Sequence, residues 1–472
     1  MTPSNRKKKG KRKRPPFRYR KKARNETPQA TSQPQSASAP QGGTVHAPPV
    51  PREPARPRTG RIVSLDPLAP IIVRSARPMN AHTDADPAQF PPPSTVAGCL
   101  RTAWARATDR PFGPELAQLA VAGPLLVRND GRVLAPKPAD ALYFGRGEGK
   151  DESPRCVRAR PQAFGRGCGA DLPAGLLPVQ LTEQLAGKPG DGPAWWSWED
   201  LLAFREGGDV SIDRLWRNGW SPPKGDRRTH VSIDPSTGTA AAGALYETEG
   251  LDLDVAPAAF RTRSAGRTEA AHGPAQEAAS WAGASDADSA SSSGLRVLIR
   301  CAEAVAPALV HLGGKRRLAA LEPEPEDRWP APPDGWLERI RSAGGLCLTL
   351  LTPGVFCAGY RPGWLDDTLS GSPPESPGLG LRLRGAAVER WQPHSGWDLA
   401  QRQPRPTRKL VPAGATYWFD VLGACDKGAL AALWLASVCD KPQDRLDGFG
   451  LALPGPWTPP TDDTRSGNTT HK

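Results

Sequence analysis

One order of predicted elements occurs twice in this sequence, and it constrains the fold more than any other feature. Each copy has a strand, a short apolar helix, a loop that contains glycine, and a second strand. In the first copy the opening strand covers Leu295–Cys301, a helix follows it, and the basic loop Gly313–Arg317 precedes the last strand. The repeated order indicates two related halves.

The second copy begins with a strand at Ala415–Leu422 and continues with a helix at Gly428–Val438. Its loop ends with Gly448 and Gly450, and the last strand follows directly. A chance match of helices and glycines is the alternative explanation of the repeat. The hairpin that precedes the second copy helps to decide between a true repeat and a chance match.

In that hairpin, residues 380–392 are expected to pair with residues 408–419. The order strand, helix, hairpin, helix, strand is that of the ferredoxin-like fold. We therefore predict an α+β protein with two ferredoxin-like domains and glycine-rich loops, at residues 61–325 and 335–457. The proline-rich segment at residues 322–335 separates the two halves.

The first half opens with a strand-like stretch, interrupted by Pro67 and Pro70, and then a helix. Ser94 follows three prolines and is the predicted N-cap of that helix, because its hydroxyl can accept a hydrogen bond from a free backbone N–H. Residues 228–255 place alternating apolar and polar residues around the turn "DPSTGT", which predicts a β-hairpin. We expect a long flexible loop at residues 262–294.

Residues 1–60 contain the whole charge imbalance of the chain. Thirteen Lys and Arg residues precede the first acidic residue, Glu26, and their number equals the net charge of +13. From Asn25 onward the chain is formally neutral, so an anion site there has to be a local patch. With almost no aliphatic residues, the segment cannot offset the entropy cost of ordering. We predict a disordered basic arm, which either binds nucleic-acid phosphates or serves as a solubility tail.

The spacing of the cysteines and the length of the apolar runs indicate the cellular compartment and whether a zinc site is expected. The eight cysteines include no CxxC pair, and this spacing predicts no zinc site. Scattered cysteines in a long chain indicate a reducing compartment, so we expect the cytoplasm. No apolar segment follows the basic arm as it would in a signal peptide. No apolar run reaches the roughly 18 residues that a membrane-spanning helix needs. Residues 458–472 are predicted to be a disordered C-terminal tail.

Catalytic signatures are absent from the sequence, so we expect no enzymatic activity and no cofactor. His311 beside Lys315 is the nearest approach to a general base with a neighbouring cation. A lone histidine is more often structural. Asp366 and Asp367 are adjacent and could bind a cation, but capping of a turn is the more common role of such a pair.

The first candidate for RNA binding is the loop Gly313–Arg317, in which two glycines precede three cations. Small residues at a helix end let backbone N–H groups approach a phosphate, and neighbouring cations add charge. The alternative is a helix C-cap glycine followed by solvated charges. The loop is not a Walker loop, because its sequence lacks GxxxxGK[ST].

The second candidate interleaves cations with tryptophans between residues 390 and 409. Single-stranded RNA is held by cationic grooves and by aromatic side chains that stack on its bases. The alternative is that both tryptophans are core residues and the arginines are solvated. The residues concerned are Arg390, Trp391, Trp397, Arg402, Arg405, Arg408 and Lys409.

Nine motifs in order, from about Arg61 to Trp457, carry a family resemblance. They are "LDPLAPIIVRSARPM", "FPPPSTVAGCLRTAW", "GPLLVRNDGRVLAPKPADAL", "HVSIDPSTGTAAAGALYETEGL", "HLGGKRRLAAL", "LLTPGVFCAGYRPGWLDDTLSG", "VERWQPHSGWDLA", "PRPTRKLVPAGATYWF" and "QDRLDGFGLALPG". Together they resemble the third subunits of the type III-B CRISPR–Cas effector, the Cmr complex, which belong to the RAMP superfamily.

The resemblance implies two ferredoxin-like, RRM-related domains with Gly-rich loops in a non-enzymatic subunit. Such a subunit grips the 5′ repeat-derived tag of the guide RNA and contacts the large palm-domain subunit and the repeating backbone subunit. Base pairing would read the target, and the protein would hold the backbone and tag. The RNA-binding residues implied in this chain are Ser94, Thr95, Gly313, Gly314, Lys315, Arg316, Arg317, Arg390, Trp391, Trp397, Arg405, Arg408, Lys409, Gly448 and Gly450.

Two segments depart from the family pattern. The turn Arg74–Met79 lacks the expected Asp-Gly and aromatic residue, and the second glycine loop carries Asp444 and Asp447 beside Arg445. These acids weaken the case for a phosphate contact there. Two other functions stay open: a guide-RNA-processing endonuclease of the same superfamily that uses a histidine as general base, and a sequence-tolerant nucleic-acid-binding protein that depends on the basic arm.

Overall fold

The computed structural model describes residues 60–73, 87–145, 154–165, 167–183, 185, 187–254, 294–398 and 403–460. These residues lie in one compact unit that begins at Arg56. The predicted basic arm, the Arg74–Met79 turn, all but the last residue of the loop predicted at 262–294, and nearly all of the C-terminal tail lie outside the described residues.

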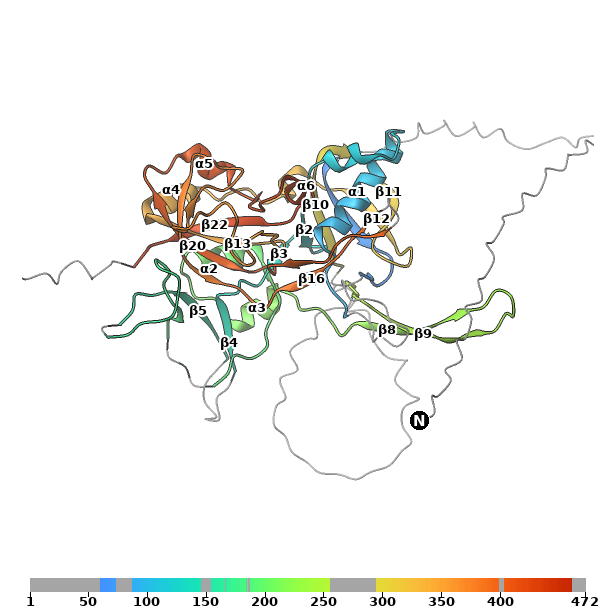
Figure 1. Cartoon of the computed structure of the whole chain (residues 1–472), viewed down its shortest axis with the longest axis horizontal. Helices are drawn as coiled ribbons and strands as arrows, with labels where there is room; N and C mark the ends of the chain where they lie inside the picture. The colour runs from blue at the N-terminus through green and yellow to red at the C-terminus, as the bar shows by residue number, and fades with distance from the viewer. Residues whose placement is uncertain are drawn as a thin grey trace, which may run out of the picture. The chain divides into compact units, whose positions relative to one another are not determined.

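The first large sheet is antiparallel and has the order β11-β12-β1-β10-β2-β3-β7 (Figure 1). Its strands are β1 (Gly60–Pro67), β2 (Val121–Val127), β3 (Val133–Pro136), β7 (Trp195–Ser197), β10 (Arg296–Val305), β11 (Ala308–His311) and β12 (Leu318–Pro323). Helix α1 (Pro93–Ala107) covers one face, where its Val96 and Leu100 share a core with Val63, Leu65 and Val297.

The second large sheet has the order β14-β15-β20-β13-β22-β21. Its strands are β13 (Gly345–Leu350), β14 (Ser370–Gly371), β15 (Gly380–Ala387), β20 (Thr416–Leu422), β21 (Ala436–Ser437) and β22 (Leu451–Trp457). Helices α4 (Trp336–Ala343) and α5 (Lys427–Ala432) pack on it through Ile340 and Leu430, which belong to the same buried cluster as the strand residues Leu348 and Phe419.

A third buried cluster joins the two sheets. It contains Ile62 and Leu298 from the first sheet, Leu451 and Leu453 from β22, and Leu201 from helix α2 (Trp198–Arg205). The face of the first sheet opposite α1 is therefore covered by α2 and by the second sheet. This shared core fixes the position of loops that extend from both sheets.

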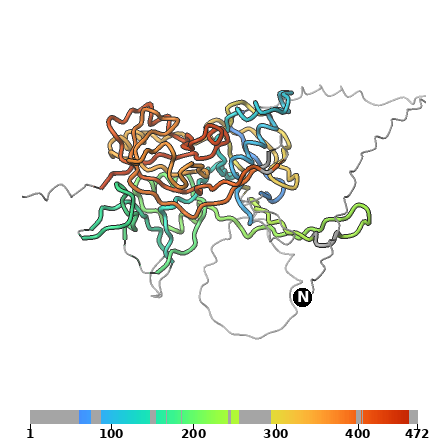
Figure 2. Tube along the Cα trace, viewed as in Figure 1, coloured from blue at the N-terminus to red at the C-terminus, as the bar shows by residue number. Residues whose placement is uncertain are grey.

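Smaller elements complete the described part of the chain. They are β4 (Ala141–Phe144), β5 (Arg155–Pro161), β6 (Val179–Leu181), α3 (Ile212–Asn218), β8 (Asp226–Ile233), β9 (Ala240–Gly250), β16 (Gln392–His394), β17 (Trp397–Asp398), β18 (Gln403–Pro404), β19 (Arg408–Leu410), α6 (Pro442–Leu446) and 3-10 helices at Pro114–Gln118 and Glu326–Arg328. The β8–β9 hairpin extends away from both large sheets (Figure 2). No helix among the described residues is long and apolar enough to cross a membrane.

The α+β class and the predicted hairpins are confirmed. Strand β8 pairs with β9, β15 pairs with β20, and β16 pairs with β19. The helix predicted at Gly428–Val438 is shorter, because α5 ends at Ala432 and a short strand follows.

The helix predicted after Leu295–Cys301 is wrong. Strand β10 continues to Val305, and β11 follows after Pro307, which has no N–H to continue a ladder. The strand pairing identifies both segments, because Val305 pairs with Gly60 of β1 and residues 308–311 pair with β12. The predicted N-cap is also wrong: α1 begins at Pro93, and the preceding residue, Pro92, provides no side-chain cap.

Candidate nucleic-acid interface

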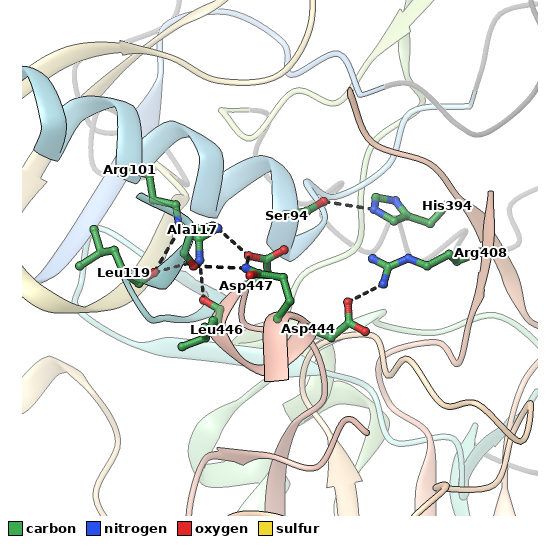
Figure 3. A network of polar contacts seen from close by, with 10 residues as sticks. Ser94, Arg101, Ala117, Leu119, His394, Arg408, Asp444, Leu446 and Asp447 are labelled. Atoms are coloured by element: carbon green, nitrogen blue, oxygen red, sulfur yellow. Dashed lines mark hydrogen bonds and ion pairs between the residues drawn. The ribbon is translucent and has the colours of Figure 1, made fainter. Parts of the chain in front are cut away.

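The N-terminus of α1 meets the β16–β19 hairpin. Ser94, which was predicted to cap the helix, lies in its first turn, and its Oγ is 3.1 Å from Nε2 of His394 in β16 (Figure 3). The two residues are 300 positions apart in the sequence. The structure thus brings together two of the segments that were predicted to bind RNA. Thr95 lies beside Ser94 and is half-buried.

His394 is buried, with 7% of its surface exposed, and its ring packs edge-on against Phe449 at 5.6 Å. Burial, and to a smaller extent the positive charges of Arg408 and Arg405, lower the pKa of His394 to about 4. The imidazole is therefore neutral at pH 7. It serves as a hydrogen-bonding partner of Ser94 and carries no charge that could hold a phosphate.

Arg408 lies directly across from His394 in the β16–β19 pairing. Its guanidinium forms an ion pair with Asp444 of α6 (Figure 3). It also lies 5.5 Å from the centre of the Phe449 ring. The side chain is only one-third exposed, so Arg408 is a cation held in place at the end of the ladder next to the connecting loop.

The outer side of this hairpin presents cations and an aromatic ring to solvent. Trp391 is 47% exposed, and the Nζ of Lys409 lies 5.0 Å from its ring centre, within the range of a cation–π contact. Arg390, Arg405 and Lys409 are exposed. For Trp391, a core role is therefore wrong. Trp397 is in β17, but its side chain lies outside what the structure describes, as does Arg402.

Two hydrogen bonds shape the loop that carries Arg405. Its backbone N–H donates to the carbonyl of Gly396 at 2.8 Å, and Ser395 Oγ donates to the Arg405 carbonyl at 2.6 Å. The backbone of the loop is thereby fixed while the Arg405 side chain stays exposed. The loop therefore presents this cation on the same hairpin as Lys409.

A pocket of about 220 Å³ opens between the α1 N-terminus and this hairpin. Most of its lining side chains are apolar, and His394, Thr352 and two glutamines are the polar ones. Its lining residues are Gln89, Phe90, Pro91, Pro92, Pro93, Pro124, Pro136, Ala194, Trp195, Leu351, Thr352, Pro353, Gln392, Pro393, His394, Leu410 and Ala413. The pocket is thus bordered by segments of both large sheets.

The loop Gly313–Arg317 is a hairpin turn between β11 and β12, so the alternative of a helix C-cap is wrong. Gly313 has φ +75°, and a Cβ there would lie 2.5 Å from the carbonyl oxygen of Ile72. The N–H of Gly314 donates to that same carbonyl at 2.7 Å, so this amide is already used. Lys315 donates to the hydroxyl of Tyr246 in β9 at 2.5 Å.

Lys315 and Arg316 are exposed at this turn, and Arg317 is half-buried. The contacts of the turn are therefore with Ile72 and Tyr246, and those of the β16–β19 hairpin are with α1 and α6. The structure places the two predicted RNA-binding segments on different elements. The exposed cations of the turn, rather than its glycine amides, are the groups available to a ligand.

Gly448 and Gly450 are buried. Gly448 has φ +90°, and a Cβ there would lie 2.6 Å from the carbonyl oxygen of Gly123 in β2. Gly450 has φ +67°, and a Cβ there would lie 2.6 Å from Sγ of Cys439. Both glycines are therefore inside the fold and not on the surface: Gly448 allows close packing against the first sheet, and Gly450 allows close packing against the segment that follows β21.

Asp444 and Asp447, which were expected to weaken a phosphate contact, are both paired. Asp447 accepts from Arg101 of α1 at 2.5 Å, and Asp444 accepts from Arg408 (Figure 3). Sequence reasoning missed the roles of Arg101 and His394, because nothing in their local sequence points to partners 346 and 300 residues away.

Histidines and acidic residues form no metal site in the described ranges, where no group of three or more His, Cys, Asp or Glu is suitably placed. His311 is exposed on β11, and Lys315, its expected cationic neighbour, is engaged with Tyr246. His394 contacts the Ser94 hydroxyl and lies opposite Arg408 in the strand pairing, but it is buried.

Most of this chain matches the model of one protein family, described as CRISPR-associated protein (Cas_Cmr3), over residues 63–457. No curated protein matches it. A chain of the type III-B Cmr-beta complex bound to cognate target RNA and AMPPnP, state 1, matches with 14% identity and a TM-score of 0.38, covering 76% of this chain and 86% of that chain. A chain of the Cmr-beta complex bound to cognate target RNA matches with 15% identity, the same TM-score of 0.38 and the same coverage, 76% and 86%.

Proposed function

The chain belongs to the Cas_Cmr3 family of CRISPR-associated proteins, and on this premise we propose that it is a non-catalytic, RNA-binding subunit of a type III-B Cmr ribonucleoprotein in antiviral defence. In this role it holds the 5′ tag of the guide RNA. It contacts the large palm-domain subunit and the repeating backbone subunit, in the cytoplasm. We also propose that each large sheet with its helices is a RAMP variant of the ferredoxin-like fold with Gly-rich loops.

The observation that best supports RNA binding is the exposed cationic and aromatic side of the β16–β19 hairpin. Trp391 offers a ring face to a base, and Lys409 and Arg405 offer charge to phosphates. Base stacking on an exposed aromatic ring contributes about 1–3 kcal/mol per base and tolerates any sequence. A single-stranded tag fits this surface better than a duplex, because a duplex keeps its bases stacked.

The non-enzymatic part of the proposal is supported by the surroundings of the two histidines already described. A general base has to reach the proton that it removes, and His394 is buried against Phe449. The endonuclease alternative is tested by incubating repeat RNA with the purified chain, with and without divalent metal. Cleavage that disappears in His394→Ala or His311→Ala would establish the alternative in place of our proposal.

RNA binding is tested on the full chain by fluorescence anisotropy with a 5′-tagged single-stranded RNA, at several salt concentrations. The variant Trp391→Ala with Arg405→Ala and Lys409→Ala is expected to weaken binding at least tenfold, because it removes a stacking surface and two phosphate contacts. The control is Arg160→Ala with Lys224→Ala, since both side chains are exposed on other elements. Equal affinity of the two variants would contradict the proposal.

Deletion of residues 1–60 separates this proposal from arm-driven binding. The deletion removes all of the net positive charge and none of the hairpin residues. Non-specific affinity and its salt dependence should decrease, while the effect of the hairpin variant should persist in the shortened chain. If the hairpin variant has no effect once the arm is deleted, the arm-driven function is the correct one.

A further inference from the structure

Helix α6 and the residue that follows it provide two carboxylates whose positions are unusual for acids beside an RNA-binding surface. Asp444 and Asp447 are each only 3% exposed. Acids near a phosphate site ordinarily repel the ligand, and on that basis they count against binding. Their burial and pairing suggest a different role.

Each carboxylate pairs with an arginine from a different part of the fold. Asp447 accepts from Nη1 of Arg101 at 2.5 Å, and the same guanidinium donates to the carbonyls of Leu119 at 2.9 Å and Leu446 at 3.0 Å. Asp444 accepts from Arg408 of β19. Ion pairs in which the carboxylate is buried and the guanidinium partly buried are screened less by water and salt than exposed pairs.

These side-chain contacts, which Figure 3 shows, form a closed ring together with the strand pairing of His394 and Arg408. Arg101 on α1 binds Asp447, and Asp444 on α6 binds Arg408. Arg408 faces His394 across the hairpin, and His394 contacts Ser94, which returns to α1. The ring attaches the hairpin to α1 by two routes, one through His394 and Ser94 and the other through Arg408 and α6. Both sets of contacts therefore resist movement of the hairpin relative to α1.

Gln443 anchors α6 further. Its Nε2 donates to the carbonyl of Ala117 at 3.2 Å and to Oδ1 of Asp447 at 2.9 Å. Ala117 lies in the short 3-10 helix that precedes β2, so α6 is attached to the first sheet at several points. The helix therefore provides a fixed support from which Asp444 reaches the hairpin.

We propose that Asp444 and Asp447 are positioning residues for RNA binding: they hold Arg408 and the β16–β19 hairpin against the α1 N-terminus, so that the hairpin cations and the adjacent pocket face the RNA together. This inference rests on the proposed function. It makes the two acids contribute to the binding of a polyanion, although their own charge opposes it.

The direction in which Asp444→Asn changes the RNA affinity separates a positioning role from simple charge repulsion. Asp444→Asn removes a negative charge, so repulsion predicts tighter RNA binding and a steeper salt dependence. Positioning predicts the opposite, because the unpaired Arg408 and its hairpin lose their fixed geometry. We expect Asp444→Asn to weaken binding of a 5′-tagged single-stranded RNA by about tenfold, or about 1.4 kcal/mol.

The matched control is Glu389→Gln. Glu389 lies next to the hairpin, its side chain is 63% exposed, and it is 3.7 Å from Lys137. This change removes the same charge from the same region without touching the ring, so it should tighten binding slightly. Asp444→Glu keeps the charge, should restore part of the affinity, and carries the test if Asp444→Asn fails to fold.

Hydrogen exchange of the amides in β16 and β19 provides a readout that does not involve RNA. Exchange should become faster in Asp444→Asn and stay unchanged in Glu389→Gln. Wild-type chain that does not bind the RNA would contradict the proposed function itself. If the wild type binds the RNA and Asp444→Asn binds it as tightly as Glu389→Gln does, the positioning role is overturned and the proposed function is not. Weaker binding by Asp444→Asn with unchanged hydrogen exchange in the hairpin would also overturn the positioning role.

Discussion

The carboxylate of Asp140 accepts two hydrogen bonds from the guanidinium of Arg205, at 2.8 and 2.7 Å, and both residues are buried. The hydroxyl of Thr416 in β20 donates to the same carboxylate at 2.9 Å. Asp140 lies between β3 and β4, and Arg205 is the last residue of α2. One polar cluster therefore connects the first sheet, the helix beneath it and the second sheet.

Asp140→Ala should destabilise the protein strongly, because it leaves the Arg205 charge buried without its partner. The expected loss is about 3–5 kcal/mol of unfolding free energy, measured by urea denaturation. Asp140→Leu combined with Arg205→Met should recover most of that loss, since neither charge then has to be buried. A double variant as unstable as Asp140→Ala would show that the pair is needed for more than mutual neutralisation.

Gly448→Ala should also destabilise the fold, because two separate effects act at this position. The residue has φ +90°, which is unfavourable for alanine, and the new Cβ would lie 2.6 Å from a backbone oxygen of β2. Gly207 is the matched control: it has φ +91°, and a Cβ added there would have no other atom within 4 Å. We expect a loss of about 1 kcal/mol for Gly207→Ala and clearly more for Gly448→Ala. Equal losses in thermal denaturation would show that the close approach relaxes without cost.

His394 predicts how stability depends on pH. Its folded-state pKa of about 4 is below the ordinary value of 6.5, so between these values the unfolded state binds a proton that the folded state excludes. The stabilising contribution is complete above pH 6.5 and is lost as the pH falls toward 4, by up to about 3 kcal/mol. His394→Gln should reduce this dependence between pH 6.5 and 5, because glutamine does not bind a proton in this range. Parallel profiles for the His394 variant and the wild type would contradict the burial argument.

Local signals in the sequence were sufficient for much of the fold. The turn "DPSTGT" between alternating residues identified the β8–β9 hairpin, and the segments 380–392 and 408–419 identified strands that do pair. The segment after Cys301 was misread, because alanine-rich stretches with little polar alternation suit a helix as well as an edge strand. The pairing of residues 308–311 with β12 makes this part of the segment a strand.

The site was less predictable than the fold. Charge and aromatic composition identified the segment around Trp391 and Lys409, which is exposed as a binding surface requires. The Ser94–His394 contact and the Arg101–Asp447 pair have no local signal, since each joins residues that only the packing of the two sheets brings together. The buried Gly448 was assigned to a ligand because a glycine for close packing and a glycine for phosphate approach look the same in a sequence.

The turn between β11 and β12 gives the last prediction. Lys315 and Arg316 are exposed there, and the turn itself is fixed by the Gly314–Ile72 hydrogen bond. If these cations contact the phosphates of the tag, Lys315→Ala with Arg316→Ala should weaken binding about equally for different tag sequences, because phosphate contacts do not read bases.

The salt dependence of that variant is the decisive measurement. Its slope should decrease by up to about 0.7 for each phosphate of the single-stranded RNA that is no longer neutralised. Thermal stability should change by no more than about 1 kcal/mol, since both side chains are exposed and the main loss is the surface hydrogen bond from Lys315 to Tyr246. Arg160→Ala with Lys224→Ala removes the same charge elsewhere and should leave the slope nearly unchanged. Equal slopes for the two double variants would show that Lys315 and Arg316 are solvated charges on an ordinary hairpin turn, because phosphate contact is the step that releases counterions.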